Sequence, residues 1–434
     1  MHLLLAQKGS ISDGEKAIDL GQSAGDIVFL TAADTELSAI AAAVRARGEA
    51  GPKWRLASLM ALKHPMSVDT YVERTARHAR LIVVRALGGA SYFQYALEAL
   101  HAAAQRSGAM IAVLPGDDKP DEGLSSFSNL AAEDLSALWA YLIEGGDANA
   151  GGVVAYAEAL VAGTEKPEPA RPLLKAGIWW PGRGVIGVEE WRRCSGFAQA
   201  STPVIAICFY RALVQSGETK PVEALIDALK AEGLAALPVF VSSLKDAVSV
   251  DTLRAIFAEA PPAVVINATG FAVSAPGAER RATVLDEGGA VVLQAIFSAS
   301  AKEAWQASNQ GLSARDLAMN VALPEVDGRV LARAVSFKSA ARFDERVEAN
   351  IVTHEPEPGR VAFVAALATR WARLRQTPAA GRRVALIMAN YPNRDGRLGN
   401  GVGLDTPTGT IEVLRAMEKA GYAVGHVPEN GDAL

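Results

Sequence analysis

The chain has 434 residues, of which 50% are hydrophobic and 21% are charged, and its formal net charge is −5. A single hydrophobic core rarely grows beyond about 250 residues, so this length predicts several domains. The acidic balance argues against a nucleic-acid partner, whose usual footprint is a basic face. The apolar runs are far shorter than a membrane span, and the N-terminus lacks the layout of a signal peptide. With two cysteines, neither a disulfide framework nor a zinc cluster is expected, and the sequence predicts a cytoplasmic protein.

The first 165 residues alternate between short apolar runs and helix-like segments. Strands are expected at residues 27–30, 56–59, 81–84 and 110–114. Helices are expected at residues 36–45, 92–104, 133–143 and 153–162. Continuous apolar strands separated by helices indicate a parallel sheet that is covered on both faces. Residues 1–165 are therefore predicted to form an N-terminal α/β domain.

Residues 166–172 are the clearest linker, because three prolines in seven residues favour an extended spacer. A second α/β domain is predicted over residues 173–310. Its expected strands are 174–178, 204–209, 237–241 and 264–266, and its expected helices are 222–231 and 250–257. This alternation predicts a second parallel sheet.

Residues 311–381 are expected to form a connecting region, turn-rich at first and helical at 360–375. Residues 382–434 are expected to start a further Rossmann-like unit, with strands at 384–388 and 422–427 around a helix at 407–420. Thr406 suits the N-cap of that helix, Pro407 its first turn and Gly421 its C-terminal cap. Such a β-α-β piece leaves strand edges uncovered, so we expect the chain to be truncated within this unit. The predicted fold class is α/β, with tandem Rossmann-like or flavodoxin-like units and parallel sheets.

Three loops follow expected strands, where open α/β sheets bind ligands. Residues 87–92 hold two glycines before a helix, which suits either an anion at the helix N-terminus or a tight packing turn. Residues 177–184 contain paired tryptophans, which could stack on a flat ligand or plug a domain interface. In the third loop, Asn267 and Thr269 could hydrogen-bond a ligand or simply close the turn.

The fourth loop, residues 390–405, lies between an expected strand and the helix at 407–420. It holds four glycines, three asparagines, two arginines and two aspartates. A connection in an α/β unit needs only about 2–6 residues, so a long polar loop in this position favours a binding role.

Some motifs are absent from the sequence. It contains no Gly-x-x-x-x-Gly-Lys-Ser/Thr element, which excludes a P-loop ATPase on this chain, and no Gly-x-Ser-x-Gly elbow, which argues against a hydrolase. The six histidines show no i, i+4 pair and no short ligand spacing. The sequence therefore identifies neither a catalytic residue nor a metal ligand.

Taken in order, these loops resemble the large subunits of aerobic cobaltochelatases, the CobN family. The resemblance covers essentially the whole chain and is strongest in residues 384–407, 266–273 and 316–328. Magnesium chelatase large subunits share a related layout, with a Thr-Gly-Phe and a Leu-Pro-Glu-x-Asp-Gly element. The Asn-Tyr-Pro motif at 390–392 and the Gly-Leu-Asp-Thr-Pro motif at 403–407 favour the cobalt branch.

The resemblance implies a subunit that binds the corrin precursor hydrogenobyrinic acid a,c-diamide and receives cobalt as the substrate metal. It also implies that AAA+ partner subunits of the CobS/CobT type bind Mg²⁺ and hydrolyse ATP. Family chains are far longer than this one, so this chain alone is expected to be inactive. No membrane and no nucleic acid are expected as partners.

The resemblance also implies candidate substrate-binding residues, carried over by motif position. They come from the fourth loop, the Leu-Pro-Glu element and the third loop: Asn390, Asn393, Arg394, Asn400, Asp405, Glu325, Asp327, Asn267 and Thr269. Asp405 equally suits the start of a helix, and Glu325 and Asp327 equally suit a turn.

Two other functions fit the same motifs. One is a magnesium chelatase H-type subunit, which would prefer a porphyrin over the corrin precursor. The other is a non-catalytic scaffold that docks AAA+ partners, against which tetrapyrrole binding would count.

Overall fold

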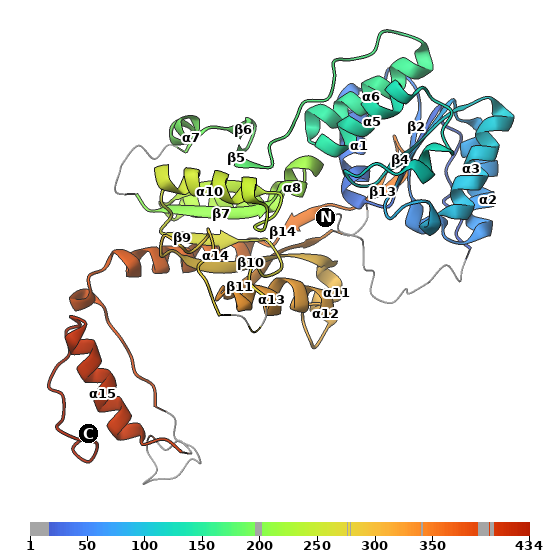
Figure 1. The fold of residues 1–434 in the computed structure, drawn as a ribbon. Helices are drawn as coiled ribbons and strands as arrows, with labels where there is room; N and C mark the ends of the chain where they lie inside the picture. Colours follow the sequence, from blue (N-terminus) through green and yellow to red (C-terminus); the bar gives the residue numbers. More distant parts are fainter. Residues whose placement is uncertain are drawn as a thin grey trace. The chain divides into compact units, whose positions relative to one another are not determined.

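The computed structural model describes residues 17–195, 202–275, 277, 279–339, 342–388, 399 and 403–434 (Figure 1). The chain divides into two compact units, Met1–Ala366 and Leu367–Leu434. The first unit holds two large sheets, a two-stranded hairpin and the cleft described below. None of the helices in the described part of the chain is long and apolar enough to cross a membrane.

The first sheet has four parallel strands in the order β2-β1-β3-β4. They are β1 (Ile27–Thr31), β2 (Trp54–Ser58), β3 (Leu81–Ala86) and β4 (Met110–Pro115). Successive side chains of a strand point to opposite faces. Ile27 and Phe29 accordingly lie in one core, and Val28 and Leu30 in the other. The four expected strands and their parallel arrangement are confirmed.

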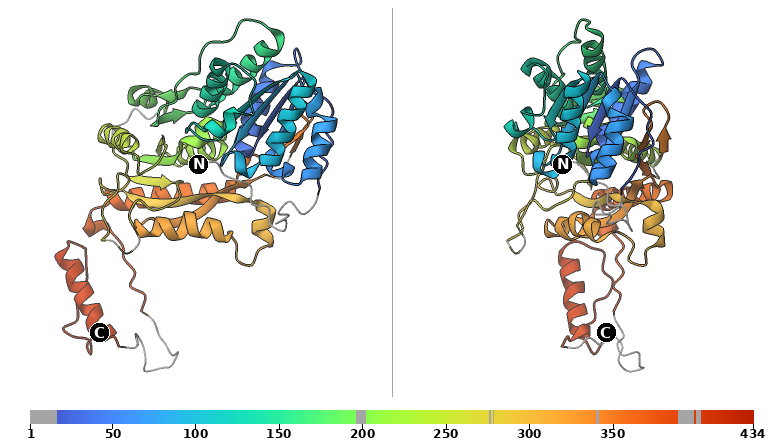
Figure 2. Two further views of the ribbon diagram at one scale, coloured as in Figure 1. Left: turned by 45° about the vertical axis from the view of Figure 1, so that its right-hand side comes forward. Right: turned by 90° about the vertical axis from the view of Figure 1, so that its right-hand side faces the viewer.

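Helices cover both faces of this sheet (Figures 1 and 2). On one face lie α1 (Asp34–Arg47), α5 (Ala132–Glu144) and α6 (Asp147–Ala162). On the other lie α2 (Pro65–Arg74) and α3 (Gln94–Ser107), and the short α4 (Glu122–Ser125) follows β4. The segment 166–172 contains neither helix nor strand, as its prolines predict.

The second sheet has eight strands in the order β14-β11-β10-β9-β7-β8-β5-β6. Its parallel centre consists of β7 (Val204–Tyr210), β8 (Ala235–Val241), β9 (Val264–Asn267), β10 (Val291–Ala301) and β11 (Val330–Lys338). Three antiparallel strands flank it: β5 (Ala176–Trp180), β6 (Gly184–Ile186) and β14 (His354–Pro356). The expected strand at 174–178 is present, but the expectation that it runs parallel is wrong, because β5 pairs antiparallel with β8 and then turns back into β6.

Helices alternate along the chain with the strands of the second sheet. They are α7 (Val188–Cys194), α8 (Arg211–Ser216), α9 (Lys220–Ala231), α10 (Ala247–Glu259), α11 (Lys302–Ala307), α12 (Ala314–Leu317), α13 (Leu323–Val326) and α14 (Pro358–Gln376). A π-helical turn, Ala318–Ala322, joins α12 to α13. The buried residues of α10 share a core with β7 and β8.

The region expected to connect domains, residues 311–381, supplies strands to the second sheet and returns to the first. β11 pairs with β10, and β14 pairs with β11. Between them, β12 (Arg342–Asp344) and β13 (Ala349–Ile351) form a hairpin, and β13 lies beside the first sheet (Figures 1 and 2). The amide of Leu56 in β2 donates to the carbonyl of Val347 at 3.1 Å.

The second unit contains the helix α15 (Thr406–Lys419). Its N-cap is Asp405, whose carboxylate accepts from the amide of Thr408 at 3.1 Å, so the expectation that Thr406 is the cap is off by one residue. The expected strands at 384–388 and 422–427 are not formed. A strand needs a partner for its main-chain groups, and within the described residues neither segment has one.

Candidate functional site

A cavity of about 420 Å³ lies where the carboxyl ends of the parallel strands of both sheets meet. From the first sheet it is lined by residues that follow β1, by the end of β3 and by residues that follow β4, among them Glu36, Arg85 and Asp117. From the second sheet it is lined by Tyr210 and Arg211, at the end of β7, and by Ser242, which follows β8. We call this cavity the inter-sheet cleft.

The strand order identifies the first sheet's part of the cleft as a ligand position. In the order β2-β1-β3-β4, the chain adds β2 on one side of β1 and β3 on the other, so the connections run in opposite directions from the gap between β1 and β3. In open α/β sheets, ligands bind outside the carboxyl ends of the strands at such a switch point. Glu36 follows β1 and Arg85 ends β3, so both side chains stand at this point. The volume of the cleft is within the range of small-molecule sites.

Arg85 and Glu36 form a buried ion pair in the cleft. Arg85 is 2% exposed, and its Nε lies 2.6 Å from Oε1 of Glu36. The other carboxylate oxygen of Glu36 accepts from the Thr31 hydroxyl at 2.6 Å. Nη2 of Arg85 donates to the carbonyl of Gly116 at 3.2 Å, whereas neither Nε, despite its ion pair with Glu36, nor Nη1 has a hydrogen-bond partner among the residues that the structure describes. The guanidinium is therefore fixed in place with donors left over.

Gly116 has a steric reason to be glycine. A Cβ atom there would lie 2.4 Å from the Cα of Leu87, which follows β3 and also lines the cleft. The close approach of these two chain segments brings the carbonyl of Gly116 within reach of Arg85.

The opposite wall of the cleft carries Tyr210 and Arg211. The Tyr210 hydroxyl donates to the carbonyl of Gly270 at 3.1 Å, and burial raises its pKa to about 12, so it stays protonated at neutral pH. Arg211 bonds to the carbonyls of Leu173 and Leu174 and lies 2.9 Å from the Glu144 carboxylate. Burial lowers the pKa of Arg211, and the charge of Glu144 opposes that shift.

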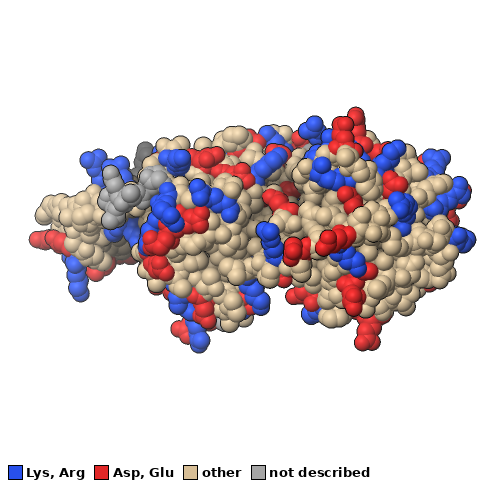
Figure 3. Space-filling view, turned by 90° about the horizontal axis from the view of Figure 1, so that it is seen from above, with Lys and Arg blue, Asp and Glu red and all other residues tan. Residues whose placement is uncertain are grey.

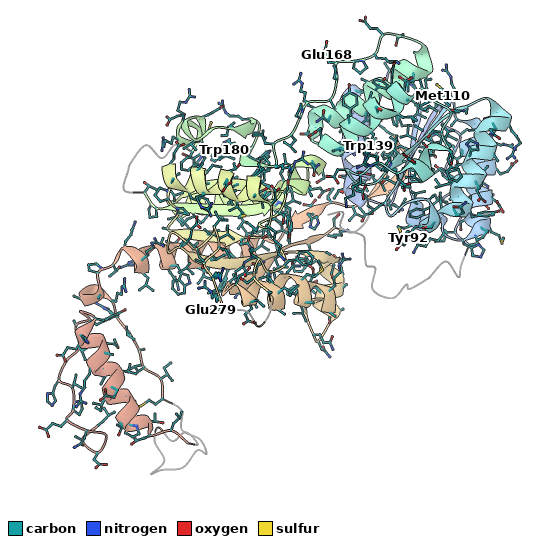
Figure 4. The ribbon with its side chains drawn as sticks, in the orientation of Figure 1. Tyr92, Met110, Trp139, Glu168, Trp180 and Glu279 are labelled. Carbon is teal, nitrogen blue, oxygen red and sulfur yellow. The ribbon has the colours of Figure 1, made fainter. Side chains whose placement is uncertain are left out.

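The remaining wall consists of α5, α6 and the residues that follow β4. Tyr141 and Val153 supply apolar surface, and Asp117 and Asp118 supply carboxylates. Trp139 on α5, labelled in Figure 4, donates its indole N–H to the carbonyl of Asp117 at 3.1 Å. The cleft thus combines apolar walls with a few convergent polar groups, which is the usual composition of a ligand site.

Asn267 and Thr269, which the sequence predicted to contact substrate, lie at the carboxyl end of β9 and are fully buried. The Asn267 amide nitrogen donates to the Thr269 carbonyl at 3.0 Å and to Gln294 at 2.8 Å. The Thr269 hydroxyl donates to the Asn267 amide oxygen at 2.9 Å. These side chains satisfy one another, which supports the turn-closing alternative.

The structure brings Asp327 next to the same turn. Its carboxylate accepts from the amides of Val273 and Ser274 at 2.7 and 2.9 Å, and it lies 2.9 Å from Nη2 of Arg329. Burial alone would raise the pKa of Asp327, but these hydrogen bonds and the Arg329 charge together lower it. Glu325 is exposed on α13 and lies outside this network.

The other predicted residues belong to the fourth loop. Asn390, Asn393, Arg394 and Asn400 lie outside the described residues, so their contact with substrate stays a prediction. Asp405 caps α15, which supports the alternative that it starts a helix.

The paired tryptophans of the second loop serve packing. Trp179 is 8% exposed and meets Phe209 edge-on, with ring centroids 6.5 Å apart. Trp180, labelled in Figure 4, packs partly buried against the core of the second sheet. This arrangement fits the interpretation as a hydrophobic plug.

Sequence reasoning missed Arg85 and Arg211. Arg85 is the penultimate residue of β3, and Arg211 directly follows β7. A position at the carboxyl end of a buried parallel strand was the signal that could have identified both residues. Among the described residues, no group of three or more His, Cys, Asp or Glu is placed to hold a metal ion.

The fold and cleft define an α/β protein with two sheets, one parallel and one with a parallel centre, and a candidate ligand site between the carboxyl ends of their parallel strands. A family model described as CobN/Magnesium Chelatase matches residues 139–434, which is most of the chain. The chain belongs to the CobN/magnesium chelatase family.

Relatives from both branches of this family match the chain. The aerobic cobaltochelatase subunit CobN of Sinorhizobium sp is 69% identical over 439 residues, which cover 100% of this chain and 34% of that protein. The Pseudomonas aeruginosa subunit of the same name is 40% identical and is covered to the same extents. The chloroplastic magnesium-chelatase subunit ChlH of rice is 27% identical over 65% of this chain and 21% of its own length.

A solved structure agrees with these relatives. The catalytic subunit of cobaltochelatase from Mycobacterium tuberculosis superposes with a TM-score of 0.70 at 28% identity, over 95% of this chain and 32% of that one. The chain therefore spans about a third of the length of the cobaltochelatase subunits that it matches.

Proposed function

We propose that the chain is the N-terminal part of the large subunit of an ATP-dependent cobaltochelatase, which inserts cobalt into hydrogenobyrinic acid a,c-diamide during cobalamin biosynthesis. The observation that carries this proposal is the 69% identity to a cobaltochelatase subunit over the whole chain. The lower identity of 27% to a magnesium-chelatase subunit, over 65% of the chain, favours cobalt over magnesium as the substrate metal. A cytoplasmic location stays a prediction.

The proposed reaction has several chemical steps. Metal insertion removes two protons from ring nitrogens and replaces the water ligands of cobalt by those nitrogens. Carboxylates or imidazoles near the ring would accept the protons, and oxygen or nitrogen ligands would deliver the metal. AAA+ partner subunits of the CobS/CobT type would bind Mg²⁺ and hydrolyse ATP.

This part of the subunit would contribute to holding the macrocycle. The peripheral carboxylates and carboxamides of the corrin precursor suit arginine side chains and main-chain N–H donors. The inter-sheet cleft offers two arginines, Arg85 and Arg211. The fourth loop, with Asn390, Asn393, Arg394 and Asn400, is proposed as a second contact region on the grounds of its composition.

The surface charge is consistent with a small-molecule substrate. Figure 3 shows lysines and arginines interspersed with aspartates and glutamates over the face that it displays. That face offers no broad basic surface of the kind that nucleic acids need.

The test is a titration of the purified chain with hydrogenobyrinic acid a,c-diamide and, separately, with protoporphyrin IX, followed by absorbance. We expect saturable binding of the corrin precursor and weaker binding of the porphyrin. Asn400→Ala and Arg394→Ala should weaken corrin binding if the fourth loop contacts the ring. Preference for the porphyrin would move the chain to the magnesium branch, and binding of neither would remove substrate binding from this part of the subunit.

A further inference from the structure

Arg85 has hydrogen-bonding capacity that the protein does not use. A guanidinium carries five N–H donors in a fixed plane. Nη2 reaches the carbonyl of Gly116, and Nε lies in an ion pair with Glu36, but within the described parts of the chain neither Nε nor Nη1 makes a hydrogen bond. Buried donors without an acceptor are costly and uncommon, so such a group calls for an explanation.

The surroundings of Arg85 point to a ligand as that explanation. Arg85 lines the inter-sheet cleft, at the switch point where open α/β sheets bind ligands. Nη2 is bonded to the Gly116 carbonyl, and Nε lies 2.6 Å from the Glu36 carboxylate, which in turn accepts from Thr31 at 2.6 Å, so the guanidinium is held in position in advance. Pre-organised arginine donors match the two oxygens of a carboxylate or a phosphate.

The equivalent point of the second sheet is already filled by the protein. Its strand order reverses between β7 and β9. There Asn267, Thr269 and Gln294 bond to one another, and Arg329 is paired with Asp327. The first switch point, by contrast, opens into the cleft.

Charge distinguishes between the two classes of oxyanion. The charge of Arg85 is already balanced by Glu36, and that of Arg211 by Glu144. Asp117 and Asp118 add two carboxylates to the wall. A phosphate dianion would be repelled by these carboxylates more strongly than a single carboxylate group would. The same aspartates can accept hydrogen bonds from the N–H groups of a carboxamide.

We propose that the inter-sheet cleft binds a carboxylate-bearing small molecule through the Arg85 guanidinium, with Asp117 and Asp118 accepting from amide N–H groups of the same ligand. In a step that rests on the proposed function, the ligand is the tetrapyrrole, whose peripheral carboxylate and neighbouring carboxamide enter the cleft. Arg85 is then a binding residue for the edge of the ring.

The test removes the Arg85–Glu36 pair as a unit, because deleting one partner would leave a buried charge. Arg85→Met with Glu36→Gln is compared with Arg55→Met with Glu348→Gln in the full chain. In the second pair Arg55 lies in the same sheet as Arg85 and is buried, Glu348 is partly buried 2.8 Å away, and neither residue lines the cleft. Circular dichroism and the melting temperature establish that each variant folds.

Two probes are used: hydrogenobyrinic acid a,c-diamide, followed by absorbance, and glutarate, followed by the melting temperature, with inorganic phosphate as comparator. We expect the cleft variant to weaken corrin binding about tenfold or more and the control to change it less than about twofold. We expect glutarate to raise the melting temperature of the parent and of the control but not of the cleft variant.

Other outcomes separate the two proposals. Corrin binding that the cleft variant leaves unchanged would overturn the cleft site and keep the proposed function. Stabilisation by glutarate that depends on Arg85, without binding of any tetrapyrrole, would keep the carboxylate site and overturn the proposed substrate. Stabilisation by phosphate that depends on Arg85 and exceeds that by glutarate would overturn the assignment to carboxylates. Unchanged responses to both probes would overturn the site altogether.

Discussion

At the scale of single residues, His354 is the most perturbed histidine in the described part of the chain. It is 3% exposed, and neither ring nitrogen has a hydrogen-bond partner among the described residues. Burial lowers its pKa from 6.5 to about 4, and the positive charge of Lys338 on β11 acts in the same direction, whereas Glu355 opposes both. Glu218, whose carboxylate accepts from the His354 amide at 2.7 Å, has a raised pKa because it too is buried.

The first prediction is that His354 makes the protein less stable as the pH falls from about 6.5 towards 4. In this interval the unfolded chain binds a proton at His354 and the folded protein does not, so the free energy of unfolding decreases with falling pH. Between pH 7.5 and 5.0 the contribution amounts to about 2 kcal/mol. Urea unfolding at both pH values should show that lowering the pH costs the His354→Gln variant about 2 kcal/mol less stability than it costs the parent. Glu218 shifts stability in the opposite direction, but it is present in both proteins.

The control for this prediction is His78→Gln, since His78 is exposed. It should reproduce the pH dependence of the parent. An identical pH dependence in His354→Gln and the parent would show that His354 does not titrate differently on folding.

The second prediction concerns Asp327, which the sequence singled out for substrate binding and the structure places in a buried ion pair. Asp327→Asn leaves the Arg329 guanidinium, whose side chain is 2% exposed, without its counter-charge. Breaking a buried pair from one side costs about 3–5 kcal/mol. We expect urea unfolding to show a loss of that order for Asp327→Asn and little change for Glu325→Gln, an exposed position two residues earlier. Equal stabilities of the two variants would contradict the structural role.

At the scale of elements, the hairpin β12–β13 is the connection that the sequence did not reveal. Glu348, directly before β13, lies 2.8 Å from Nη2 of Arg55 in β2 and accepts hydrogen bonds from Ser23. Its main-chain carbonyl accepts from Gln22 at 2.6 Å. Glu348 also has a φ of 48°, a conformation that non-glycine residues seldom adopt, so these contacts hold a strained residue in place.

The third prediction is that Glu348→Ala destabilises the protein by about 3 kcal/mol, because Arg55 is 5% exposed and loses its charged partner. Glu345→Ala, in the same hairpin but at an exposed position, should be close to neutral. Hydrogen exchange read by mass spectrometry should show faster exchange of β2 in the first variant alone. Unchanged exchange of β2 would mean that the hairpin does not support the first sheet.

Whether the sequence predicted a strand depended on how apolar that strand is. β1, β7 and the first four residues of β3 are apolar almost throughout, and such runs identify buried parallel strands. β10 was missed because Gln294 and Ser298 interrupt its apolar run. Both are buried, and their partners, Asn267 and Asp316, lie far away in the sequence. A pattern of hydrophobicity cannot show that a distant side chain satisfies a buried polar one.

The candidate site shows the same limit. Glycine-rich and polar loops drew attention to residues 267–272, whose polar groups turned out to satisfy one another. The cleft depends instead on Arg85 and on its unfilled Nη1, which only the packing of β3 beside β1 and β4 determines. Strand order decides where a switch point lies, and a single sequence does not contain strand order.

At the scale of the molecule, the two sheets are joined into one unit that includes the cleft. Lys338 of β11 lies 3.0 Å from Asp34 of α1, and Arg211 of α8 lies 2.9 Å from Glu144 of α5. The carbonyl of Gln215 accepts from the amide of Gly146 at 2.6 Å, which fixes α8 against the connection between α5 and α6. A ligand in the cleft would therefore contact groups from both sheets in a pre-set geometry.

The last prediction is that both sheets unfold together. Contacts of this kind couple two layers when they are buried, so hydrogen exchange in increasing urea should give β3 and β7 the same midpoint. Lys338→Met with Asp34→Asn removes a tie between the sheets and should lower both midpoints by the same amount. Arg254→Met with Glu287→Gln removes an exposed pair of similar length, 2.8 Å, within the second layer alone, and should leave both midpoints unchanged. Two separate midpoints in the parent would show that the sheets are independent domains. A cleft between independent domains could not hold Arg85 and Tyr210 in a fixed relation before the ligand binds.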